Sequence, residues 1–174
     1  MTRIDFYVLS SSEEVGRLRL ACRLADKIFR LGKKLYIHTE NAKQNQELDN
    51  LLWTFQDISF LPHDIASEEL THNTKMHEGR VNQETTTRLD SNGSADPELS
   101  KPQPSPILIG HSHTPPAYFD VLINLARETP LFFSRFERLA EIVDEQANNR
   151  AAARARYRFY RDRGYPLQHH HITV

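Results

Sequence analysis

Over most of this 174-residue chain, short apolar runs alternate with segments whose apolar residues recur at helical spacing. This alternation constrains the fold more than any other feature of the sequence. β-Branched, aromatic and large apolar side chains fill residues 3–9, 35–38 and 58–61, which predicts three strands. Between them, apolar side chains at steps of three and four predict helices over residues 15–29 and 41–53. Strands joined by helices form mostly parallel sheets, so we expect a three-layer α/β fold with helices on both faces.

The same pattern resumes in the second half of the chain. Residues 107–109 and 121–123 are compact apolar runs typical of buried strands. Residues 139–143 fit a helix or a strand, and the order of elements in an α/β fold favours a strand. Asp144 is the expected N-cap of a final helix that ends near Arg163.

Two segments depart from this pattern. Residues 67–105 contain no Phe, Tyr or Trp, and their few apolar residues follow no period. Such a segment buries too little apolar surface to offset its ordering entropy, so we predict a disordered, flexible insertion. Residues 165–174 are expected to form a loose tail. The chain is therefore predicted to be a single α/β domain, residues 1–174, with this insertion and this tail.

Composition excludes several classes of protein. The 22 basic and 23 acidic side chains nearly cancel, so a role in binding nucleic acid or acidic ligands requires a local patch. No apolar run approaches the roughly 20 residues that cross a bilayer, and the first residues do not resemble a signal peptide. Cys22 is the one cysteine, which excludes an internal disulfide. We expect a cytoplasmic protein.

The predicted final helix carries a one-sided cluster of arginines. Residues 145–164 contain six Arg, one Glu and one Asp. At 100° per residue, one arc of about 100° collects Arg150, Arg154, Tyr157, Arg158 and Arg161. The opposite arc, expected to pack on the sheet, holds Ala151, Ala152, Ala155 and Phe159. The arginine row suits an anion with an apolar group, either a peptide carboxylate beside a ring or phosphates beside a base; a solvated basic face explains the same spacing.

Signatures of nucleotide binding and covalent catalysis are missing from the sequence. It has no G-x-G-x-x-G and no G-x-x-x-x-G-K-[ST] motif, and the carboxylates of Glu13 and Glu14 would repel a pyrophosphate after the first strand. No serine lies in a G-x-S-x-G elbow, and Cys22 falls on a buried helical face. We therefore expect a Rossmann-like fold without a nucleotide-binding loop, a non-catalytic protein and no cofactor.

Nine histidines raise the alternative of a metal site. His111, His113 and Asp120 could hold a metal in a hydrolase, and residues 169–171 form a histidine triplet near the end of the chain. No set of cysteine ligands and no His-Glu-x-x-His helix accompanies them. We predict loop and tail histidines rather than a metal centre.

Several ordered matches carry a resemblance to a known family. They lie at residues 5–9, 32–39, 48–53, 59–63, 106–110, 120–125, 154–161 and 164–165. Over residues 3–66 and 106–168 the chain resembles the chi subunit of bacterial DNA polymerase III. The chain departs from the family pattern at the insertion, residues 67–105, which is longer and more polar than the family needs. None of the matched motifs lies in it.

The resemblance implies an accessory, non-catalytic subunit of a DNA-directed DNA polymerase complex that acts in DNA replication with the clamp loader. Its implied partners are the psi subunit, where present, and single-stranded DNA-binding protein, whose acidic C-terminal tail ends in a Phe with a free carboxylate. DNA is then contacted indirectly. Direct binding of single-stranded nucleic acid through the same helix is the alternative.

The resemblance also implies a site for that tail. Arg154 and Arg150 are expected to bind carboxylates, with Tyr157 and Arg158 beside them and Arg161 as a secondary contact. Residues implied at the apolar end of the site are Trp53, Phe60 and Val143. On spacing alone, an ordinary core role is the simpler explanation for Trp53 and Phe60.

Overall fold

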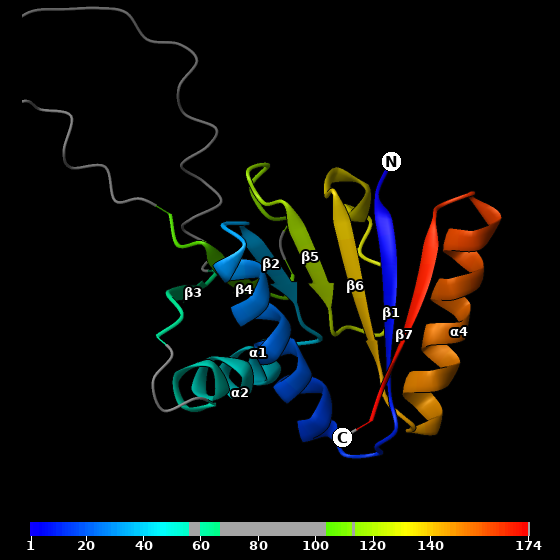
Figure 1. Cartoon of the computed structure of the whole chain (residues 1–174), viewed down its shortest axis with the longest axis horizontal. Coiled ribbons are helices and arrows are strands. Elements are labelled where there is room, and N and C mark those ends of the chain that lie inside the picture. Colours follow the sequence, from blue (N-terminus) through cyan, green and yellow to red (C-terminus); the bar gives the residue numbers. More distant parts are fainter. Residues whose placement is uncertain (56–59, 67–103, 113, 174) are drawn as a thin grey trace, which may run out of the picture.

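A computed structural model describes residues 1–55, 60–66, 104–112 and 114–173 and shows a sheet of seven parallel strands (Figure 1). The strands lie in the order β3-β4-β2-β5-β6-β1-β7. In chain order the elements are β1 (Arg3–Leu9), α1 (Glu14–Arg30), β2 (Leu35–His38), α2 (Ala42–Thr54), β3 (His63–Ile65), β4 (Ile107–Gly110), β5 (Val121–Asn124), the 3-10 helix η1 (Phe133–Arg135), β6 (Arg138–Val143), α4 (Ala147–Asp162) and β7 (Leu167–Ile172).

Helices cover both faces of this sheet, which confirms the predicted three-layer α/β fold. Leu18 of α1 and Leu48 of α2 pack with Ile37 and Ile123 on one face. Tyr160 of α4 packs with Phe6 on the other face. Figure 1 shows α4 on the opposite side of the sheet from α1 and α2. Since successive side chains of a strand point to opposite faces, central strands such as β2 and β5 supply both cores. The ambiguous segment 139–143 is a strand, as expected, within β6.

The third strand lies further along the chain than expected. Residues 58 and 59 of the predicted strand lie outside the described residues, and Phe60 and Leu61 are not in a strand. β3 begins at His63, where pairing with Ile107 of β4 starts. Pro62 has no backbone N–H to donate to a ladder, which explains why pairing begins only after it.

The final helix differs from the prediction in its start and in its buried face. Gln146, not Asp144, is the N-cap residue, although Asp144 Oδ1 accepts a hydrogen bond from the Gln146 backbone N–H at 3.1 Å. The expected buried residues Ala151, Ala152, Ala155 and Phe159 are exposed or only partly buried. The buried positions are instead Ala153, Arg156 and Tyr160. The pattern analysis assigned Arg156 to neither face, and an arginine is buried only when a partner compensates its charge.

The end of the chain is an ordered strand, which corrects the prediction of a loose tail. β7 pairs in parallel with β1 along its length, from Ile4 opposite Leu167 to Leu9 opposite Ile172. Leu167 and Ile172 also pack against the two cores. Because residues 169–171 are three consecutive histidines, the segment lacks the alternation of apolar and polar residues that is typical of a strand. Pairing with β1, rather than the local sequence, therefore makes it a strand. The predicted insertion falls mainly on residues 67–103, which lie outside the described residues.

A buried carboxylate ties β1 to both of its neighbouring strands. Asp5 Oδ2 accepts a hydrogen bond from Arg138 Nε of β6 at 2.5 Å, and His170 Nε2 of β7 lies 2.8 Å from Asp5 Oδ1. Burial by itself would raise the pKa of Asp5, but these hydrogen bonds and the charges of Arg138 and Arg3 outweigh it and lower the pKa below 3.8. The folded state therefore favours the ionised carboxylate.

We expect Asp5→Asn to lower the free energy of unfolding by about 1–3 kcal/mol near pH 7, because the partners of the lost charge are partly exposed and screened. The contribution of Asp5 is complete above its unfolded-state pKa and is lost as the pH falls through its lower folded-state pKa. The difference between wild type and variant should therefore shrink below about pH 4. Urea unfolding from about pH 7 to about pH 3 measures this. Asp162→Asn, at an exposed pair with Arg161, is the control; a constant difference at all pH values contradicts the assignment.

Candidate partner-binding site

A pocket of about 250 Å³, which we call the α4 pocket, lies between α4 and the sheet at the β7 edge. Side chains from β1, β6, β7 and α4 line it, so segments from both ends of the chain build one site. The lining residues are Phe6, Val8, Val143, Arg150, Ala153, Arg154, Tyr157, Arg158, Arg161 and His169.

The pocket combines positive charge with an apolar floor. Four of its lining residues are arginines, and none of the described residues that line it carries a carboxylate. The rings of Phe6 and Tyr157 meet edge to face with centroids 5.6 Å apart, beside Val8 and Val143. Guanidinium groups form charge-assisted hydrogen bonds with carboxylates or phosphates, while the floor can take up an apolar side chain. The arrangement suits an anionic ligand that carries an apolar group.

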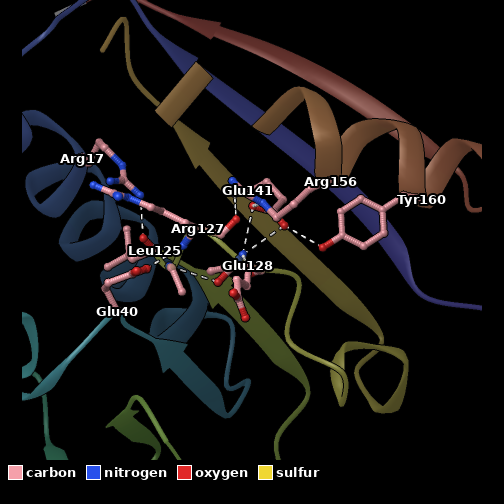
Figure 2. A network of polar contacts seen from close by, with 10 residues as sticks. Arg17, Glu40, Leu125, Arg127, Glu128, Glu141, Arg156 and Tyr160 are labelled. Atoms are coloured by element: carbon pink, nitrogen blue, oxygen red, sulfur yellow. Dashed lines mark hydrogen bonds and ion pairs between the residues drawn. The ribbon is translucent and has the colours of Figure 1, made fainter. Parts of the chain in front are cut away.

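A buried ion pair beneath α4 fixes which side of the helix faces the pocket (Figure 2). Arg156 Nε donates to Glu141 Oε2 of β6 at 2.9 Å, and the Tyr160 hydroxyl donates to Glu141 Oε1 at 2.7 Å. The Asn124 side-chain amide lies 3.2 Å from both Glu141 oxygens. Burial, followed by the adjacent Glu141 charge, raises the pKa of Tyr160, so its hydroxyl stays a donor.

This network also reaches the loop after β5. Arg156 Nη1 donates to the backbone carbonyl of Arg127 at 2.6 Å. With Arg156 and Tyr160 held inward, helical geometry turns Arg154, Tyr157 and Arg158 toward the pocket. The buried arginine thus sets the position of the exposed ones.

Most of the predicted site residues come together in this pocket. Arg150, Arg154, Tyr157, Arg158, Arg161 and Val143 all line it.

Trp53 and Phe60 are not brought to the pocket, which corrects the expectation of one continuous site. They are 51% and 67% exposed, and their ring centroids are 5.2 Å apart. Trp53 belongs to α2, and Phe60 lies just before β3, whereas the pocket lies at the β7 edge. Strand order separates them, because β3 and β7 are the two opposite edges of the sheet.

Sequence reasoning missed four lining residues: Phe6, Val8, Ala153 and His169. Alternation along β1 could have found Phe6 and Val8, since they share a face of that strand. His169 had no such signal, because the prediction of a loose tail removed it from the fold.

A family model described as "DNA polymerase III chi subunit, HolC" matches residues 1–168 of the chain. The DNA polymerase III subunit chi of Pseudomonas aeruginosa is 37% identical over 172 residues, covering 99% of this chain and 98% of that protein. The chain belongs to the DNA polymerase III chi subunit family. The resemblance deduced from the sequence is thereby confirmed.

Other chi subunits match the chain at lower identity. The subunit from Escherichia coli is 27% identical, covering 96% of each chain, and that from Haemophilus influenzae is 26% identical, covering 94% of this chain and 92% of the relative. The crystal structure of T4 UvsW superimposes with a TM-score of 0.58 and 9% identity. It covers 99% of this chain, which spans 42% of the UvsW chain, and at this identity the likeness shows the fold alone.

The alternative metal residues make other contacts. His111 Nδ1 lies 2.8 Å from the Asn45 side-chain amide, and Asp120 Oδ2 accepts from the Lys34 backbone N–H at 2.8 Å. His113 lies outside the described residues. Across residues 1–55, 60–66, 104–112 and 114–173, no three His, Cys, Asp or Glu side chains are grouped to hold a metal ion.

Two further expectations concern reactivity and membranes. Cys22 is buried, and burial raises the pKa of its thiol to about 12, so the thiolate nucleophile is strongly disfavoured. Within the described part of the chain, no helix has the length and apolar character needed to cross a membrane.

Proposed function

We propose that this chi family member links DNA polymerase III to single-stranded DNA-binding protein by holding the acidic C-terminal tail of that protein in the α4 pocket. As a chi subunit it is an accessory subunit of the polymerase, and in this proposal it has no catalytic role of its own. The observation that carries the proposal is the pocket itself, in which four arginines surround an apolar floor and none of the described lining residues is acidic.

The chemistry of such a tail complements the pocket. A C-terminal Phe brings an apolar ring and a free carboxylate in one residue, and the preceding acidic residues bring further negative charge. Arg154 and Arg150 are proposed to bind carboxylates, and Val143 lies on the floor where an apolar ring fits. Because both arginines are exposed, we expect micromolar, salt-sensitive binding.

The free carboxylate provides the direct test. We expect an N-acetylated, aspartate-rich peptide ending in Phe with a free carboxylate to bind at least about tenfold more tightly than the same peptide with a C-terminal amide, since a charge-assisted hydrogen bond contributes about 1.5–3 kcal/mol. Isothermal titration calorimetry measures both affinities. Equal affinities, or no binding of either peptide, contradict the proposal.

Direct binding of single-stranded nucleic acid is the alternative, and the ring of Tyr157 among guanidinium groups is the observation that favours it. A bare oligonucleotide, titrated in the same buffer as the peptide, separates the two. Tight binding of the oligonucleotide without binding of the peptide supports the alternative.

We also infer association with the psi subunit where one is present, as membership of the chi family suggests. Co-expression followed by size-exclusion chromatography tests this association. A chain that elutes separately from psi contradicts it.

A further inference from the structure

His169 of β7 lies in the wall of the α4 pocket. It lies opposite Phe6 in the register of β1 and β7, and the two rings stack with centroids 5.7 Å apart. The centroid of Tyr157 on α4 is 5.3 Å from that of His169. The side chain is exposed, so it can meet a ligand in the pocket. β7, which follows α4 in the sequence, thus places the imidazole of His169 in the same pocket as the guanidinium groups of α4.

The groups that face His169 from the helix are cationic or neutral. Tyr157 contacts the ring directly. The arginines of α4 that share the pocket are Arg150, Arg154, Arg158 and Arg161. On β7 itself, His171 lies on the same face two residues further on, and His170 points to the opposite face.

Among the described residues, no carboxylate from a strand lines the pocket. β1 contributes Phe6 and Val8, and its Asp5 contacts His170 on the other side of the sheet. Glu141 of β6 is fully buried in the network with Arg156 and Tyr160. No described acidic residue that lines the pocket can therefore neutralise a protonated His169 in the free protein, whereas an acidic ligand can.

We propose that His169 is a specificity-determining residue of the pocket, which favours acidic ligands more strongly when its ring is protonated. This inference rests on the proposed function, because it assigns a role to a residue of the same site. A carboxylate bound beside the ring stabilises the imidazolium form, so ligand binding takes up a proton at His169. Arginines and ligand carboxylates do not titrate near neutral pH, so they contribute no competing change.

The expected effect is moderate because the site is partly open to solvent. Wild-type protein should bind the acidic peptide about three- to fivefold more tightly at pH 6 than at pH 8, the scale of one partly screened charge pair. His169→Gln should lose most of this pH dependence. His169→Lys carries a permanent charge and should bind at pH 8 about as tightly as wild type does at pH 6.

The experiment uses calorimetry of the full chain with the N-acetylated, aspartate-rich peptide that ends in Phe with a free carboxylate. Titrations in two buffers of different ionisation enthalpy give the number of protons taken up. His170→Gln, on the opposite face of the same strand, is the matched control and should retain the wild-type pH dependence. His171→Gln measures the contribution of the neighbouring ring. Thermal unfolding of each variant checks that it is folded.

The outcomes separate this inference from the proposed function. If wild type binds the peptide but His169→Gln shows the same pH dependence and proton uptake, the role of His169 is wrong and the tail-binding function stands. If His171→Gln removes the pH dependence instead, the role of His169 is also wrong. If wild type does not bind the peptide at either pH, both the function and this inference fail.

Discussion

Replacing Arg156 by Met is expected to lower the free energy of unfolding by about 3–5 kcal/mol, the cost of breaking a buried ion pair from one side. The Arg156 side chain is only 5% exposed, and its guanidinium donates to Glu141 and to the Arg127 carbonyl. Without it, the Glu141 carboxylate remains fully buried, and its remaining donors among the described residues are the neutral side chains of Tyr160 and Asn124. The unpaired charge, rather than lost packing, is the main cause of the effect.

Arg158→Met is the matched control for this prediction, since it makes the same change two residues along α4 at an exposed position. It should alter stability by no more than about 0.5 kcal/mol. Guanidinium chloride unfolding followed by circular dichroism measures both variants. Glu141→Gln provides a second test, because it leaves the Arg156 charge buried and should also destabilise strongly. Similar stabilities for Arg156→Met and Arg158→Met contradict the proposed importance of the network.

The second large effect is expected on binding. Arg154→Ala should weaken binding of the acidic peptide by about 1–3 kcal/mol, roughly five- to 150-fold, because a charge-assisted contact to a carboxylate is lost. Arg154 lies in the pocket and is exposed, so the substitution should leave the fold intact. Its loss should also reduce the dependence of affinity on salt, since fewer cationic groups face the ligand.

A control for net charge is available near the end of α4. Arg163 is not among the residues that line the pocket, and its guanidinium lies 3.6 Å from the centroid of the Phe159 ring. Arg163→Ala removes the same charge and should change peptide affinity by less than about twofold. Calorimetry at two salt concentrations measures both variants. Equal losses for Arg154→Ala and Arg163→Ala indicate that overall charge, not the pocket, attracts the peptide.

The two predictions rest on residues that the sequence presents in the same way. Arg154, Arg156 and Arg158 alternate along one short stretch, and the residue type alone does not distinguish the buried arginine from the two exposed ones. In the folded chain Arg156 reaches a carboxylate 15 positions earlier, whereas the other two face the pocket. A helical wheel could place Arg154 and Arg158 on a common face, but the partner of Arg156 depends on how α4 lies on β6.

Local sequence did predict much of the fold. Apolar runs give β1, β2, β4, β5 and β6 nearly at their observed positions, and helical periodicity gives α1 and α2. Continuous apolar runs, typical of strands buried on both faces, and apolar residues at helical spacing are local properties of the sequence. These elements can therefore be predicted from the sequence. Helical periodicity also predicted the arginine face of α4. The alternation of strands and helices predicted the parallel sheet.

Other features depend on which segments become neighbours. β7 is a strand because β1 offers an unpaired edge to it, and His169 joins the pocket only through that pairing. Trp53 and Phe60 lie away from the arginines because strand order puts β3 and β7 at opposite edges. The period of apolar residues determines whether a segment forms a helix or a strand. Long-range strand pairing and the compensation of buried charge decide which residues come into contact. Those contacts join residues far apart in the sequence, so a local pattern cannot predict them.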